Sequence, residues 1–166
     1  MWETLREYFE KYPSQEKIVK LMLKYGLHVR EGSIYCGDVQ IADSAIARAA
    51  GVDRRVVAAT IETIMKEKNL KEVFSSLTPT PKLKDAAHAM GWTALEIIPT
   101  DARQTGILAR VSAIIADAGV SIRQAIVDDP YLTDEPHMLI VTESQIPPTL
   151  LPVIKSVPGV KNLVLI

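Results

Sequence analysis

The chain has 166 residues, enough for one ordinary domain or two small ones. Apolar residues make up 48% and charged residues 23%, a globular composition that excludes wholesale disorder. Lys and Arg number 19 and Asp and Glu 20, so the net charge of −1 excludes a polybasic nucleic-acid coat but leaves a local basic patch open. The single cysteine, Cys36, excludes an internal disulfide framework and a multi-cysteine zinc site.

Two further patterns bear on cellular location. No stretch reaches about 18 consecutive apolar residues, so we expect no transmembrane helix. The first residues carry acidic charge and lack the long apolar run of a secretory signal. We therefore expect a cytoplasmic protein with a reduced thiol and no membrane association.

The composition divides the chain into two halves. Residues 1–75 have helical spacing and most of the charge, whereas residues 93–166 alternate β-rich and helical runs. Between them, residues 76–92 contain a double Thr-Pro step, which disfavours helix and predicts a semi-rigid linker. Within that segment, residues 82–90 predict a short helix that ends at Gly91.

The first half begins with a pattern of helices and a hairpin. Apolar residues three or four apart predict a helix over residues 2–12, ended by Pro13. Ser14 is a plausible N-cap for a second helix that reaches Tyr25. Alternation around a Gly turn then predicts a small hairpin over residues 27–36.

Next come two helices joined by a short turn. Asp43 is expected to cap the first helix, which Gly51 ends in the left-handed conformation. Asp53 can cap the next helix, over residues 54–68, and the small Ala47 lets the two helices cross closely. Two helices joined by three residues that include Gly are typical of a helix-turn-helix, and an ordinary αα corner is the alternative.

About 20 residues here resemble the helix-turn-helix class of DNA-binding proteins, with Ala47, Gly51, Val52 and Val57 as the matching pieces. The resemblance implies that the second helix reads the major groove of double-stranded DNA. The alternative is a solvated charge pattern, since residues 1–75 hold 12 basic and 11 acidic side chains. The candidate DNA-binding residues are Arg54 and Arg55 for base edges, and Arg48 and Lys66 for the backbone.

The second half predicts the order β-α-β-β-α-β. This is the split βαβ of ferredoxin-like sandwiches, so we expect an α+β protein whose second domain has a four-stranded antiparallel sheet. Two helices would cover one sheet face, and the other face would find cover in a homodimer. The expected elements are strands at 94–99, 120–127, 138–142 and 161–166 and helices at 107–118 and 146–156.

Residues 93–166 resemble an ACT domain, a small regulatory module that binds amino acids. The resemblance rests on the Asp101 loop with Gly106, Ile107 and Leu108, and on the run 118–122. Where the family commonly has Pro and Asn, this chain has Thr105 and Ser121.

The resemblance implies an amino-acid effector whose carboxylate meets backbone amides at a helix N-terminus. At Gly106, a missing Cβ lets such amides approach a ligand, although the glycine could instead merely shape a tight loop. The implied ligand residues are Asp101, Arg103, Gly106, Ile107, Leu108, Ser121 and Ile122.

The pairing of the two halves resembles predicted archaeal regulators of amino acid metabolism, with 51–57, 121–125 and 128–130 as the matching runs. It implies a homodimer in which the effector biases the spacing of two DNA-reading helices. The alternative is a regulatory protein whose first half binds a protein partner and whose ACT half senses a metabolite.

A catalytic site is hard to build from this sequence. Cys36 and His28 could form a nucleophile and base, but a small buried cysteine is the favoured interpretation. Asp128 and Asp129, with Asp134 and Glu135 nearby, could hold a hard cation, although a solvated hairpin end is favoured. We therefore expect no enzyme activity, no metal and no cofactor.

Overall fold

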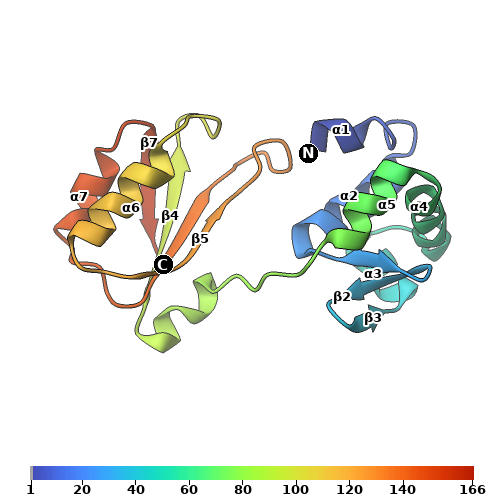
Figure 1. The fold of residues 1–166 in the computed structure, drawn as a ribbon, viewed down its shortest axis with the longest axis horizontal. Helices are drawn as coiled ribbons and strands as arrows, with labels where there is room; N and C mark the ends of the chain where they lie inside the picture. Colours follow the sequence, from blue (N-terminus) through green and yellow to red (C-terminus); the bar gives the residue numbers. More distant parts are fainter. Residues whose placement is uncertain (1) are drawn as a thin grey trace. The chain divides into compact units, whose positions relative to one another are not determined.

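The computed structural model describes residues 2–166, and position 1 of the expected first domain lies outside them. The chain forms two compact units, Met1–Pro81 and Lys82–Ile166, with seven α-helices and two sheets in the described part (Figure 1). The fold class is therefore α+β. The boundary falls inside the expected linker 76–92, so residues 76–81 belong to the first unit and residues 82–92 to the second.

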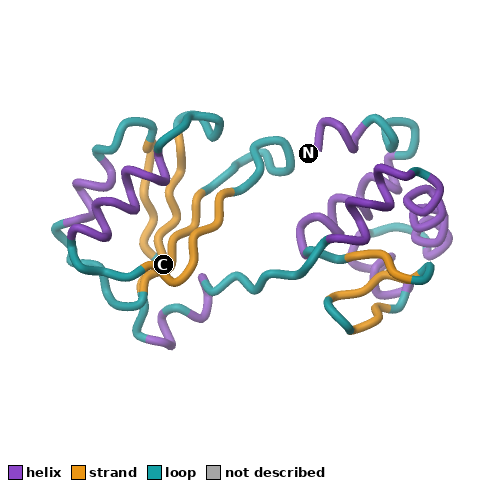
Figure 2. The backbone as a smooth tube through the Cα atoms, in the orientation of Figure 1, coloured by secondary structure: helices purple, strands orange, loops and turns teal. Residues whose placement is uncertain are grey.

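The first unit combines five helices with a three-stranded antiparallel sheet in the order β1-β2-β3 (Figure 2). Its elements are α1 (Trp2–Arg6), α2 (Pro13–Tyr25), β1 (His28–Arg30), β2 (Ser33–Cys36), β3 (Val39–Ile41), α3 (Asp43–Ala50), α4 (Arg54–Lys66) and α5 (Lys68–Ser76).

The first helices differ from the expected bounds. The helix expected over 2–12 ends at Arg6, and turns carry the chain onward, although Phe9 is still fully buried. Pro13 begins α2 instead of only ending the preceding helix, so Ser14 is not its N-cap. The physical reason is that proline is well suited to the first helical position, where its missing N–H needs no partner.

The expected hairpin is present and gains a third strand. Glu31 and Gly32 form its turn with φ values of 51° and 73°, the left-handed pair that a tight β-hairpin turn requires. Val29 lies opposite Ile34, and Ile34 lies opposite Ile41 of β3. Because β3 is only three residues long, its own periodicity was too short to predict it.

The α3–α4 pair follows the sequence prediction closely. Gly51 ends α3 at φ 65°, and the Asp53 carboxylate accepts a 2.8 Å hydrogen bond from the Arg55 backbone N–H at the start of α4. Ala42, not Asp43, occupies the cap position of α3. Thr60 takes an apolar position of α4, and its buried hydroxyl donates to the Val56 carbonyl at 2.7 Å.

The second unit is a four-stranded sheet with the order β5-β6-β4-β7 and antiparallel neighbours throughout. Each helix connects two strands that are not neighbours, which is the expected βαββαβ arrangement. The elements are two 3₁₀ turns, η1 (Lys84–Ala86) and η2 (His88–Met90), then β4 (Thr93–Pro99), α6 (Ile107–Asp117), β5 (Ile122–Val127), β6 (Met138–Thr142), α7 (Leu150–Lys155) and β7 (Val160–Leu165).

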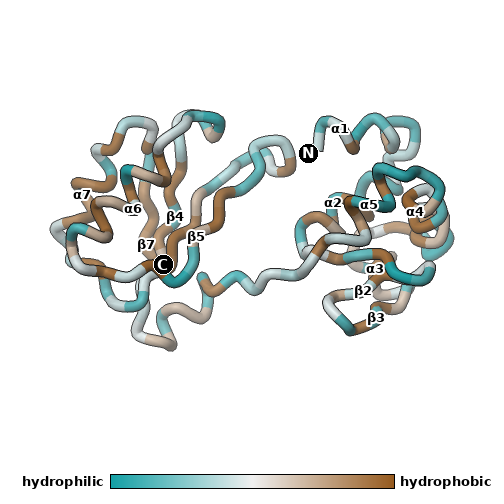
Figure 3. The backbone as a smooth tube through the Cα atoms, in the orientation of Figure 1, coloured by the Kyte–Doolittle hydropathy of each residue, from teal (hydrophilic) through white to brown (hydrophobic). Residues whose placement is uncertain are grey.

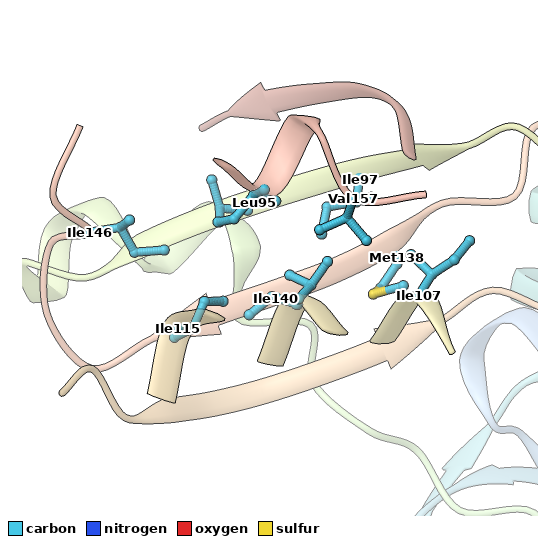
Figure 4. Packing of buried hydrophobic residues seen from close by; sticks show 10 residues of the cluster. Leu95, Ile97, Ile107, Ile115, Met138, Ile140, Ile146 and Val157 are labelled. Carbon is cyan, nitrogen blue, oxygen red and sulfur yellow. The ribbon is translucent and has the colours of Figure 1, made fainter. Parts of the chain in front are cut away.

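Helices α6 and α7 cover one face of this sheet, as expected (Figure 1). Side chains from α6 meet those of β4 and β6 in one apolar cluster, including Leu95, Ile115 and Ile140 (Figure 4). In Figure 3 the joining loops are largely hydrophilic, whereas the strands and helices carry the hydrophobic stretches. The helix expected over 146–156 begins only at Leu150, because the chain passes two prolines first.

The other sheet face is covered in part by the chain itself. Residues 82–92 form two 3₁₀ turns instead of the expected helix, and Ala87, Leu83 and Trp92 pack on Ala94, Leu139 and Val141. Polar bonds hold the segment in place, since Lys84 pairs with Glu96 and Gln124 accepts from the Leu83 N–H at 2.9 Å. From the sequence, a homodimer was expected because this face would otherwise be uncovered. Residues 82–92 cover part of it, so that reason is weaker, and the homodimer stays a prediction.

Candidate functional site

The surface of α3 and α4 carries the four candidate DNA-binding residues, all of them exposed. Within residues 2–166, Arg48 and Arg54 form no salt bridge. Arg55, in contrast, lies 3.2 Å from the Asp53 carboxylate, and Lys66 lies 2.8 Å from Glu62. Arg48 and Arg54 are therefore available to an anionic partner, whereas Arg55 and Lys66 are already paired with carboxylates of the same chain.

These local pairs shift the pKa values of their members. Hydrogen bonds from the Arg55 backbone and side chain lower the pKa of Asp53. A hydrogen bond from Lys66 lowers the pKa of Glu62 and raises that of Lys66 itself. Both pairs are exposed, so they restrain the side chains without contributing much to stability.

Arg54 also lines a hollow of about 310 Å³ at the start of α3. Ser33 and Gln40 from the small sheet also line it, and the Gln40 amide donates to the Ser33 hydroxyl at 3.1 Å. Ser44 and Asp43, in the first turn of α3, complete the lining. The hollow thus combines one unpaired cation and two hydroxyl groups with a carboxylate, and sequence reasoning did not identify it.

In the second unit, the loop after β4 brings Asp101 and Arg103 together. The Asp101 carboxylate accepts from the Arg103 backbone N–H at 2.9 Å and from its guanidinium at 3.1 and 3.3 Å. These bonds lower the pKa of Asp101 and raise that of Arg103, to which nearby Tyr131 also contributes. Asp101 and Arg103, two of the candidate ligand-binding residues, are therefore hydrogen-bonded to each other, and a ligand would have to displace one of them to bind the other.

Gly106 lies directly before α6 at φ 87°, as its expected loop role requires. The Arg110 guanidinium lies close to Gly106. A Cβ added to Gly106 would be 3.2 Å from that group. Ile107 is buried, and Leu108 is partly exposed beside a hollow of about 100 Å³. This hollow is therefore below the range of about 300–1,000 Å³ that is usual for sites of drug-sized ligands.

Ser121 and Ile122 lie at the other end of the sheet. Ile122 pairs with Thr142, whereas the loop after β4 lies near Val127 and Met138, which pair with each other. The two ends are five residue steps apart along β5, which is roughly 17 Å at about 3.3 Å per step. Within one chain the structure therefore does not join these two residues to the Gly106 loop.

A larger cavity, of about 460 Å³, adjoins the hollow at Gly106, because Pro99, Ala102, Pro136 and His137 line both. Its lining includes Asp134, Glu135 and His137 from the β5–β6 connection and Lys161 and Asn162 from β7. The sequence had singled out the two acidic residues only as a possible cation site with Asp128 and Asp129. The signal that was missed is Lys161, which β7 carries to the same cavity from far along the chain.

The structure does not assemble the metal site that was weighed from the sequence, and within residues 2–166 no hydrogen bond joins Cys36 to His28. Among the described residues, no group of three or more His, Cys, Asp and Glu side chains could hold a metal ion. His28 lies opposite Tyr35 and stacks on it at 5.7 Å, and the half-buried Cys36 is the next residue along β2, where it lies opposite Val39. Over residues 2–166, every helix is too short or too polar to cross a membrane.

Comparison with known proteins adds two distant structural likenesses. No family model and no curated protein matches the chain. An AsnC family transcriptional regulator from Agrobacterium tumefaciens is 12% identical, with 92% of this chain and 86% of that chain covered and a TM-score of 0.31. A glycine-to-threonine mutant of Rv3291c is 16% identical, with coverage of 92% and 89% and a TM-score of 0.30. Such low TM-scores do not establish a shared fold, so the function proposed below rests on the residues themselves.

Proposed function

We propose that this chain is an amino-acid-responsive transcription regulator, with a DNA-binding first unit and an effector-binding second unit. The observation that carries the proposal is the α3–α4 pair, which presents the exposed and unpaired Arg54 at the first position of its second helix. In this proposal the protein acts in the cytoplasm by binding alone, with no catalytic step and no resident metal or cofactor.

The geometry of α3 and α4 suits double-stranded DNA. A helix-turn-helix places the start of its second helix at the major groove, and Arg54 and Arg55 are the first residues of α4. The hollow beside Arg54 favours a backbone contact for this residue instead of the base-edge contact expected from the sequence, because a phosphate there would meet the Arg54 guanidinium and the Ser44 hydroxyl. The Asp43 carboxylate in the same hollow repels a phosphate, so the attraction of Arg54 has to exceed that repulsion.

A single copy carries too little positive charge for tight binding, because its first 75 residues balance to about +1. We propose that a homodimer compensates by engaging two half-sites at once, which raises avidity without new contacts. An amino acid bound to the second unit would then act by favouring one spacing of the two α4 helices.

DNA binding is tested by selecting duplexes from a randomised library and measuring affinity by fluorescence anisotropy at several salt concentrations. Arg54→Ala should weaken binding roughly tenfold and reduce the salt slope by about one, as expected for a lost phosphate contact. Arg55→Ala should cost less, because Asp53 already holds that guanidinium. Lys71→Ala, which removes an exposed cation on α5, is the matched control.

A second candidate function is a regulator whose first unit binds a protein. The near balance of charge and the neutralised Arg55 and Lys66 favour it. Failure to enrich any duplex, or an Arg54→Ala variant with full DNA affinity, would refute the DNA interface and leave this candidate standing.

A further inference from the structure

The cavity beside β7 has the size of a small-molecule site. At about 460 Å³ it lies within the range of about 300–1,000 Å³ that such sites occupy. Ile98, Pro99 and Pro136 give it an apolar floor, and all of its lining residues belong to the second unit. The hollow at Gly106 is less than a quarter of this size.

Three charged side chains line this cavity without partners. Within residues 2–166, the side chains of Asp134, Glu135 and Lys161 form no salt bridge and no hydrogen bond with the protein. The neighbouring Asp101 and Arg103, in contrast, are bound to each other. The cavity therefore offers two carboxylates and one ammonium group, a net charge of −1, to whatever enters it.

We infer that this cavity, and not the smaller hollow at Gly106, holds the effector, and that the effector is a basic α-amino acid such as lysine, arginine or ornithine. The inference rests on the proposed amino-acid response. A basic amino acid carries one carboxylate for Lys161 and two cationic groups for Asp134 and Glu135. Its net charge of +1 complements that of the site, and its methylene stem fits the apolar floor.

Other amino acids match this set of charges less well. A neutral amino acid has a single ammonium group and leaves one of the two cavity carboxylates without a cation. An acidic amino acid brings two carboxylates toward Asp134 and Glu135, which repel them, while Lys161 can pair with only one. The charge pattern therefore selects by side-chain charge, and the carboxylate contact selects an amino acid over a simple diamine.

The test is isothermal titration calorimetry on the full chain with L-lysine, L-norleucine and cadaverine. Norleucine lacks the terminal ammonium group, and cadaverine lacks the carboxylate. Lysine should bind most tightly, and each analogue should bind up to about fivefold more weakly, which is the upper end for the loss of an exposed ion pair. Lys161→Met and Glu135→Gln should each weaken lysine binding by a similar factor. The matched controls Lys155→Met and Asp117→Asn, exposed in the same unit, should leave it unchanged.

Three results would overturn the inference, and they can be told apart. Binding of a neutral amino acid that is insensitive to Lys161→Met and Glu135→Gln would reject this cavity but keep the amino-acid response. Cadaverine binding as tightly as lysine would replace the amino acid by a diamine. No heat with any of the twenty amino acids would reject both the cavity and the amino-acid response, while the DNA assay with Arg54→Ala would stand independently.

Discussion

Replacing Gly26 by alanine should destabilise the first unit by roughly 2–5 kcal/mol. Gly26 ends α2 at φ 63°, a left-handed conformation that costs a residue with a Cβ about 1–2 kcal/mol. An added Cβ would also lie 2.3 Å from the Thr78 carbonyl oxygen and 2.8 Å from the Pro79 Cα. Both of these are backbone atoms, so the chain itself must move, and overpacking of this kind costs about 1–3 kcal/mol.

Gly51→Ala separates the two contributions. Gly51 ends α3 at φ 65°, nearly the same conformation, but a Cβ there would meet nothing within 4 Å. It should therefore lose only the conformational part, about 1–2 kcal/mol. Urea unfolding followed by the fluorescence of the buried Trp2, in a Trp92→Phe background, reports on the first unit alone. Equal losses in the two variants would refute the packing of residues 78–79 against Gly26.

Two further predictions concern pH. The Glu96 carboxylate raises the pKa of Lys84, so their pair should stabilise the second unit below pH 10.5 and lose its effect as pH rises through the raised pKa. The urea midpoints of Lys84→Met and the natural chain should differ at pH 7 and converge at strongly alkaline pH, and a constant difference would contradict this. Asp53→Ala should lower the midpoint of the first unit, whereas Asp53→Asn should preserve the helix cap. Because hydrogen bonds from Arg55 lower the pKa of Asp53, the Asp53→Ala difference should be complete above pH 3.8 and should shrink as pH falls through the lowered value. What is left in strong acid should match the neutral cap that Asp53→Asn keeps, and a difference that does not change with pH would exclude this cause.

Much of the local structure of both units could be predicted from the sequence. Gly51 and Asp53 set the end of α3 and the start of α4, because left-handed backbone and a capping carboxylate are properties of single residues. Apolar periodicity was sufficient for α6 and for the order of strands and helices after Thr93. It failed where elements are short, as at β3, and where prolines delay a helix, as before Leu150.

Which side chains meet became known only from the folded chain. It placed residues 82–92 on a sheet face for which the sequence had expected a partner subunit. It separated Ser121 from the Gly106 loop by the length of a strand, and it brought Lys161 to the same cavity as Asp134 and Glu135. The physical reason is that such contacts depend on strand register and on the order of strands in the sheet. Local periodicity specifies which face of an element is buried, but not what lies beside each of its ends.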